Sequence, residues 1–167
     1  MSASLIKFLN ADFDIAKANE KICYVSKKII KDRYKSLMNN EIYWLKKLSA
    51  VNFVTNVVSF SEDEFVMTYA GEPVTEDTLP CDWRVQVDNM LSVLKKESCC
   101  HNDIKNEEIL VKNGKLNLID FEHATSTREE FKSRKLAGLC GCRMSWEDKD
   151  AFINILSHME QRKEGAA

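Results

Sequence analysis

Apolar and polar positions in the first seventy residues alternate in the way expected for a small sheet with one helix. Short apolar runs bounded by polar turns predict strands, which we place at residues 5–9, 13–18, 22–30, 53–60 and 64–69. Between the third and fourth runs, apolar residues recur every three or four positions. This spacing predicts a helix that begins at Asp32, a suitable capping residue, and ends near Leu48.

After residue 70 the pattern changes to helices and one small hairpin. The expected elements are a connector at 70–80, helices at 83–97 and 146–161, and hairpin strands at 109–111 and 116–119. The hairpin is predicted because an Asn-Gly pair separates its two apolar runs. We therefore expect a single α+β domain over 1–167, with a β-rich lobe at 1–69 and a helical lobe at 81–167.

Composition and charge narrow the classes of protein and partner. The chain has 167 residues, of which 44% are hydrophobic and 30% charged, as in an ordinary globular domain. Its 24 Lys and Arg against 26 Asp and Glu give a net charge of −2, so we expect neither a nucleic-acid partner nor a membrane partner. The short apolar start and six scattered cysteines predict a cytoplasmic protein with free thiols.

The hairpin register predicts where several acidic residues meet. If Asn113-Gly114 is the two-residue turn, counting back along both strands makes Glu108 face Ile119 and Glu107 face Asp120. The open end of the hairpin then holds two adjacent glutamates beside an aspartate.

Asp103 lies four residues before Glu107 and adds a further carboxylate to this end of the hairpin. Carboxylates this close repel one another and raise one another's pKa, and a hard divalent cation bound through oxygen would relieve the repulsion. The alternative is a solvated loop end whose charges face water or pair with Lys105. Spacing alone does not separate the metal site from the solvated loop.

Two segments around this hairpin resemble the chemistry-bearing elements of eukaryotic-like protein kinases. Residues 101–110 have the sequence HNDIKNEEIL, which resembles the kinase catalytic loop, and residues 118–122, LIDFE, resemble the metal-binding element that comes after that loop in the family. The resemblance implies Asp103 as the base that accepts the hydroxyl proton and Lys105 as a stabiliser of the transferred phosphoryl group. Asp120 is implied as the metal ligand.

The resemblance extends upstream into the predicted sheet. It implies that Lys27 binds nucleotide phosphates and is held by Glu41 of the helix, with Lys28 as the competing register. The last predicted strand of the sheet and the start of the connector, FVMTYAGE, resemble the segment that meets adenine through its backbone. The residues implied there are Thr68, Tyr69 and Ala70.

The implied protein is a minimal, atypical kinase with a bilobal fold and a shortened large lobe, using ATP and Mg²⁺ or Mn²⁺. The motif that contains Lys105 favours serine/threonine protein acceptors by resemblance. Glu108 stands where the family has a metal-binding Asn, and Glu107 is the competing ligand. Asp148 or Asp150 is expected to support the catalytic loop.

Three departures from the family pattern motivate an alternative. No glycine precedes Gly71, so the sequence lacks a glycine-rich loop over the phosphates. Glu122 stands where the family has a flexible glycine, and Asn102 replaces an arginine that reads a phosphorylated segment. The alternative is a pseudokinase that serves as a nucleotide-binding or protein-interaction module.

Overall fold

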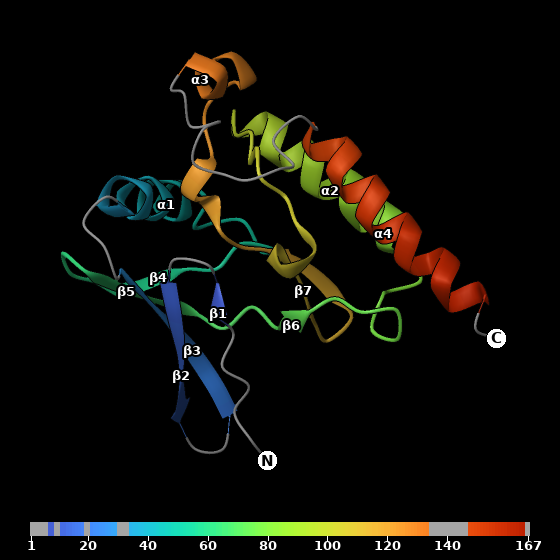
Figure 1. The fold of residues 1–167 in the computed structure, drawn as a ribbon, viewed down its shortest axis with the longest axis horizontal. Coiled ribbons are helices and arrows are strands. Elements are labelled where there is room, and N and C mark those ends of the chain that lie inside the picture. Colours follow the sequence, from blue (N-terminus) through green and yellow to red (C-terminus); the bar gives the residue numbers. More distant parts are fainter. Residues whose placement is uncertain (1–6, 9–10, 19–20, 30–33, 134–146, 166–167) are drawn as a thin grey trace.

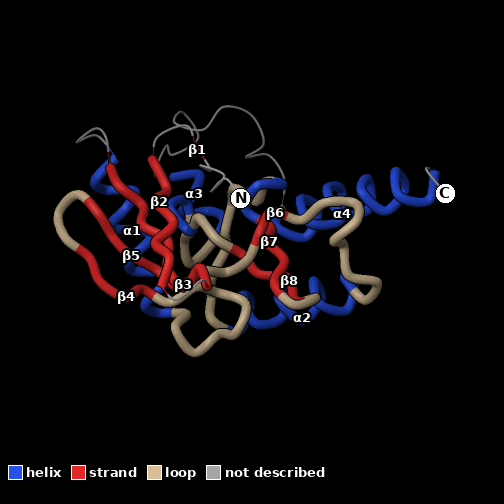
Figure 2. The backbone as a smooth tube through the Cα atoms, turned by 90° about the horizontal axis from the view of Figure 1, so that it is seen from below, coloured by secondary structure: helices blue, strands red, loops and turns tan. Residues whose placement is uncertain are grey.

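Two antiparallel sheets and the helices packed on them make up the mixed α+β fold (Figure 1). The computed structural model describes residues 7–8, 11–18, 21–29, 34–133 and 147–165. Figure 2 shows the two sheets as separate groups of strands. The α+β class expected from the sequence is confirmed.

The first sheet contains the strands predicted in the first seventy residues. Its strands are β1 (Lys7–Phe8), β2 (Ala11–Ala18), β3 (Lys21–Ile29), β4 (Val57–Phe60) and β5 (Glu64–Thr68), in the order β1-β2-β3-β5-β4. The antiparallel pairing of β3 with β5 sets Lys27 opposite Phe65. Side chains alternate along β3, so Lys27 is buried while Lys28 is exposed.

Helix α1 (Lys35–Lys47) packs one apolar face against this sheet. Leu37, Met38, Ile42 and Leu45 are buried along that face, as the helical spacing predicts. Trp44, which that spacing does not include, is buried as well. The helix begins after Tyr34, which makes no side-chain cap, and the expected cap Asp32 lies outside the described residues.

The strand predicted at 53–60 is wrong in its first half. Its backbone pairs with the second sheet instead: Phe53 O accepts the Leu118 N–H at 2.9 Å, and Val54 forms a parallel bridge with Leu118. Only Val57–Phe60 remains to pair with β5. The spacing of apolar residues in FVTNVVSF does not reveal this change of partner.

The second sheet is built from β6 (Glu72–Pro73), β7 (Ile109–Lys112) and β8 (Lys115–Leu118), in that order. Ile109 pairs with Leu118 and Lys112 with Lys115, so the predicted hairpin register is confirmed. The connector contributes β6, which the sequence did not indicate because it is two residues long and ends in proline.

Helices α2 (Trp83–Lys96) and α4 (Asp148–Gly165) lie side by side next to the second sheet (Figure 1). Trp83, Phe152 and Leu156 are fully buried in the shared core. The expected start of the last helix at 146 lies outside the described residues, and the helix continues past the predicted end at 161. No helix in the described part of the chain has the length and apolar character needed to cross a membrane.

Short turns complete the fold near the open end of the hairpin. Turn η2 (Asn106–Glu108) precedes β7, turn η3 (Phe121–His123) follows β8, and the short helix α3 (Arg128–Ser133) comes next. Asn40 of α1 donates to the carbonyl oxygens of Glu122 and Ala124 at 3.0 and 2.9 Å. Helix α1 is therefore bonded directly to the backbone around η3.

Gly71 permits the close approach of the connector to β7. Its φ is +120°, and a Cβ built at this position would lie 2.3 Å from the carbonyl oxygen of Val111. Gly114 in the hairpin turn also has a positive φ, +72°, but a Cβ there would contact nothing within 4 Å. An alanine at Gly71 would therefore meet both steric crowding and an unfavourable φ, whereas an alanine at Gly114 would meet the unfavourable φ alone.

We predict that Gly71→Ala lowers the free energy of unfolding by about 2–3 kcal/mol, because alanine meets both the strained φ and the Val111 oxygen. Gly114→Ala is expected to cost about 1 kcal/mol, for strain only. Urea unfolding of both variants measures the difference. Equal losses would contradict the crowding at Gly71.

Candidate functional site

The loop between α2 and β7 is held in place through its backbone. Asp148, in the first turn of α4, accepts the N–H groups of His101 and Asn102 at 2.7 and 2.8 Å. Cys100 exchanges two backbone hydrogen bonds with Thr125, at 2.8 and 2.9 Å. Of the two aspartates expected to support this loop, Asp148 makes the contact.

His101 supports the loop by packing. Its ring is fully buried, its Nε2 lies 2.9 Å from the carbonyl oxygen of Ile119, and its ring meets Phe121 edge to face at 4.7 Å between centroids. The loop is thereby fixed against the residues that flank Asp120 on both sides.

Asp103, Lys105 and Glu108 form one ion-paired group. Lys105 Nζ lies 2.6 Å from Asp103 Oδ2 and 3.1 Å from Glu108 Oε1. The second oxygen of Glu108 accepts the backbone N–H of Lys105 at 2.7 Å. Asp103 and Glu108 are buried while Glu107 is exposed, so Glu108 is the glutamate that faces this group.

A second ion-paired group surrounds Lys27. Its Nζ lies 2.7 Å from Glu41 Oε2, 2.7 Å from Asp120 Oδ1 and 3.5 Å from Glu122 Oε2. These carboxylates come from α1 and from the segment after β8. The strand lysine and the helix glutamate are therefore paired as expected, and Lys28 does not take part.

Asp120 reaches Lys27 because the backbone turns sharply at this residue. Its φ of 66° and ψ of 58° are left-handed and unusual for an aspartate, and they end β8 and begin η3. The N–H of Ile119 donates to the carbonyl oxygen of Glu108 at 3.1 Å, which extends the hairpin pairing to the residue before Asp120. This extended pairing brings Asp120 to the end that holds Glu108.

The Lys27 group has more negative than positive charge. Oxygens of Glu41, Asp120 and Glu122 lie within 4.8 Å of one another around one ammonium group. Burial, together with the charges of Asp120 and Glu122, raises the pKa of Glu41 to about 8 against the opposing effect of Lys27. Burial acts to lower the pKa of Lys27, but the three carboxylates outweigh it and raise that pKa.

The Lys105 group is unbalanced in the same way. Burial first, and then the negative charge of Asp120, raise the pKa of Glu108 well above its ordinary value, although Lys105 opposes this. The charge of Glu108 and the bond to Asp103 in turn raise the pKa of Lys105 against burial, so Lys105 is charged at neutral pH. Asp120 therefore acts electrostatically on both groups.

The arrangement suits a hard divalent cation. Every acidic donor here is a carboxylate oxygen, the ligand type that Mg²⁺ and Mn²⁺ prefer. The charge of Asp120 contributes, after burial, to the raised pKa of Glu108. Among the described residues, the buried oxygen Glu41 Oε1 has no hydrogen-bond partner. The residues present thus fit a divalent cation near Asp120.

The residues expected to meet adenine are Thr68, which ends β5, and Tyr69 and Ala70, which follow it, and side chains of the hairpin bind two of their carbonyl groups. Thr68 N–H donates to Asn56 O at 2.9 Å. Tyr69 O accepts from Lys112 Nζ and Ala70 O accepts from Asn117 Nδ2, both at 2.9 Å. The pattern of apolar positions gave no signal for these two hairpin side chains.

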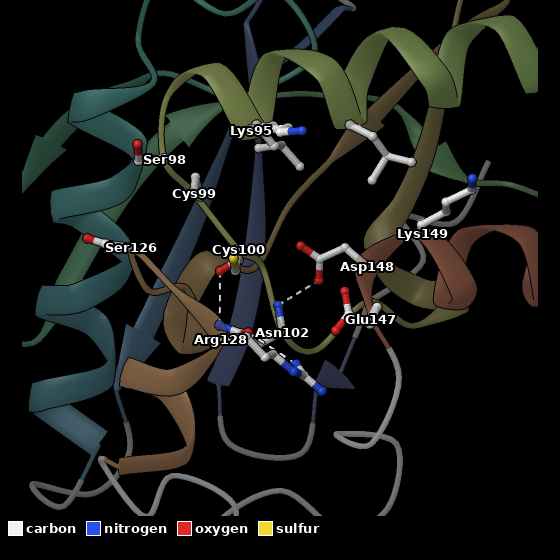
Figure 3. A pocket seen from close by; sticks show the side chains of 12 residues that line it. Lys95, Ser98, Cys99, Cys100, Asn102, Ser126, Arg128, Glu147, Asp148 and Lys149 are labelled. Atoms are coloured by element: carbon white, nitrogen blue, oxygen red, sulfur yellow. Dashed lines mark hydrogen bonds between the residues drawn. The ribbon is translucent and has the colours of Figure 1, made fainter.

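A separate cavity of about 330 Å³ opens beside the loop, between the end of α2 and the start of α4 (Figure 3). Asn102, Arg128 and Asp148 contribute to its lining, together with apolar side chains of α2. Asp103, Asp120 and Lys27 do not line it. The cavity and the acidic site therefore share only the loop between them.

Comparison with models of known protein families and with curated protein sequences gives no match to this chain.

We predict that Glu41→Gln changes how stability depends on pH. The folded protein holds the Glu41 proton more tightly than the unfolded chain, so its stabilising effect is complete below about pH 4.5 and is lost as pH rises through about 8. The free energy of unfolding of the wild type should fall across this window relative to Glu41→Gln. Urea unfolding at several pH values measures it; the exposed Glu107→Gln should follow the wild type. If the free energies of unfolding of the wild type and Glu41→Gln changed with pH in parallel, the raised pKa of Glu41 would be contradicted.

We predict that Asp148→Asn lowers the free energy of unfolding by about 2 kcal/mol, because each carboxylate oxygen accepts one backbone N–H and the amide replaces one of these oxygens with an NH2 group, which cannot accept. The matched variant is Asp150→Asn, which removes an exposed charge from the same helical turn and should cost less than about 0.5 kcal/mol. Chemical denaturation compares the two, and equal effects would exclude the supporting role of Asp148.

Proposed function

We propose that this protein is a phosphotransferase that uses ATP and a divalent metal ion, with a minimal kinase-like bilobal fold and serine/threonine protein acceptors. The observation that carries the proposal is the position of Lys27, which pairs at 2.7 Å with both Glu41 and Asp120. Asp120 in turn lies at the hairpin end that holds Asp103 and Glu108. The groups needed for phosphoryl transfer thus lie around one end of the hairpin.

In this proposal the five-stranded sheet and α1 form the small lobe. The three-stranded sheet, α2 and α4 form the shortened large lobe. ATP binds between them, with its adenine edge at the backbone of the connector and its phosphates near the lysine. The backbone groups involved are those of Thr68 at the end of β5 and of Tyr69 and Ala70 after it, and the lysine is Lys27. Glu41 holds the ammonium group of Lys27 in place. The lysine side chain therefore loses less conformational entropy when it binds phosphate.

Asp103 orients the acceptor hydroxyl and takes its proton as the oxygen attacks the terminal phosphorus. The bond between that phosphorus and the oxygen bridging it to the β-phosphate breaks, and ADP leaves with the bonding electrons. Lys105, charged and 2.6 Å from Asp103, stabilises negative charge on the transferred group. Asp120 and Glu108 would hold Mg²⁺ or Mn²⁺, which neutralises the phosphate charge when bound. The protein forms no covalent bond, so positioning and charge account for the rate.

A specific observation favours a second candidate, a pseudokinase that serves as a nucleotide-binding or interaction module. The sequence has no glycine before Gly71, and so no glycine-rich backbone to surround phosphates. Five carboxylates also face two lysines in the site, which disfavours bound phosphate unless a cation is present. Transfer of phosphate from ATP distinguishes the phosphotransferase from the module. Binding of ATP distinguishes a nucleotide-binding module from an interaction module.

We predict that Asp103→Asn lowers kcat for phosphoryl transfer by at least about 100-fold, because the proton acceptor is lost. Lys27→Met should weaken transfer comparably, whereas Lys28→Met, one residue away and exposed, should retain wild-type activity. The assay is transfer from labelled ATP to generic protein acceptors with Mg²⁺ or Mn²⁺, and thermal unfolding checks that each variant is folded.

Label transfer that persists in Asp103→Asn would overturn the role of that residue. If the wild type transfers nothing, thermal stability measured with ATP and metal distinguishes the candidates: a metal-dependent increase supports the nucleotide-binding module. No change in unfolding temperature would reject the phosphotransferase and the nucleotide-binding module, and would leave the protein-interaction module.

A further inference from the structure

Both polar atoms of the Asn102 side-chain amide are hydrogen-bonded within the protein. It is 2% exposed, and its Nδ2 lies 2.9 Å from each of three acceptors: Cys100 O, His123 O and Thr125 Oγ1. Its Oδ1 accepts a hydrogen bond from Arg128 Nη1 at 3.1 Å. Figure 3 shows this amide between the loop, Arg128 and the start of α4.

The backbone at Asn102 is also specialised. Its φ of 70° is left-handed, a conformation that asparagine and glycine adopt more readily than other residues. Its N–H is taken by Asp148 Oδ1 at 2.8 Å. Asn102 is therefore fixed both through its backbone and through its side chain.

These bonds join two segments that carry separate parts of the site. Asn102 directly precedes Asp103, while its acceptors His123 and Thr125 come after Asp120. Displacement of one segment against the other must break hydrogen bonds of a buried amide, which leaves polar groups without partners. The amide therefore limits how far Asp103 and Asp120 can move apart.

Resting on the proposed function, we propose that Asn102 is a positioning residue that sets the distance between the proton acceptor Asp103 and the metal-binding Asp120. It acts through the hydrogen bonds of its amide and touches neither substrate nor nucleotide. Its loss should reduce the rate of transfer more than nucleotide affinity, because the Lys27 pair and the connector lie in other elements.

The test compares Asn102→Gly with Asn113→Gly in the full chain. Both replace an asparagine of positive φ, 70° and 52°, with the residue that best tolerates this backbone. Asn113 is exposed in the hairpin turn, so Asn113→Gly is the matched control. For Asn102→Gly we expect kcat to fall about 10- to 100-fold while KM for ATP changes less than about threefold. Asn113→Gly should leave both unchanged.

A milder variant covers the case in which Asn102→Gly does not fold. Arg128→Met removes one of the four hydrogen bonds to the amide and should lower kcat below that of the wild type, again with little change in KM for ATP. In that case, an unchanged kcat in folded Arg128→Met would overturn the inference. Unchanged kcat in folded Asn102→Gly, or an equal loss in Asn113→Gly, would overturn the inference.

Amide hydrogen exchange separates this inference from the proposed function, since it requires no activity. In Asn102→Gly, exchange should become faster both in residues 101–105 and in residues 119–125, and in Asn113→Gly neither segment should change. If the wild type transfers no phosphate but the two variants show this exchange pattern, the proposed function is rejected and the coupling of the two segments is kept. Faster exchange confined to 101–105 rejects the coupling.

Discussion

The ammonium group of Lys27 on β3 is the contact on which the arrangement of the site depends, because two other segments, α1 and the segment after β8, supply its partners. It bonds Glu41 of α1 and Asp120 beyond β8 at 2.7 Å each, and Glu122 lies slightly farther away. A buried lysine without these carboxylates would lose its charge, and the carboxylates without it would repel one another. The ion pairs of Lys27 therefore hold strand β3, helix α1 and the end of the hairpin together. Asn40 of α1 adds two neutral hydrogen bonds at the same place.

Much of the fold depends on short-range signals in the sequence. The Asn-Gly turn fixed the hairpin register, and the register alone brought Glu108 and Asp120 to one end of it. Helical spacing identified the buried face of α1, and the strand pattern together with the resemblance led to Lys27. These succeed because periodicity and turn chemistry act over a few residues.

The features that could not be predicted depend on distant backbone. Residues 53–54 pair with Leu118 rather than with β5, and the partners of Asn40 and Asn117 are carbonyl groups, which every residue offers alike. The choice of Asp148 over Asp150 was open for the same reason, since their partners are backbone N–H groups of the loop. In the site, the resemblance named the charged residues, while the excess of carboxylates over lysines became evident only from their mutual distances.

The bonds from the hairpin to the connector have a mechanical consequence. Lys112 and Asn117 hold the carbonyl groups of Tyr69 and Ala70, and Gly71 lies directly against Val111. From Tyr69 onward the connector therefore moves as part of the three-stranded sheet. A rotation of one sheet relative to the other would have its pivot at the end of β5, immediately after Thr68, rather than being spread along the connector.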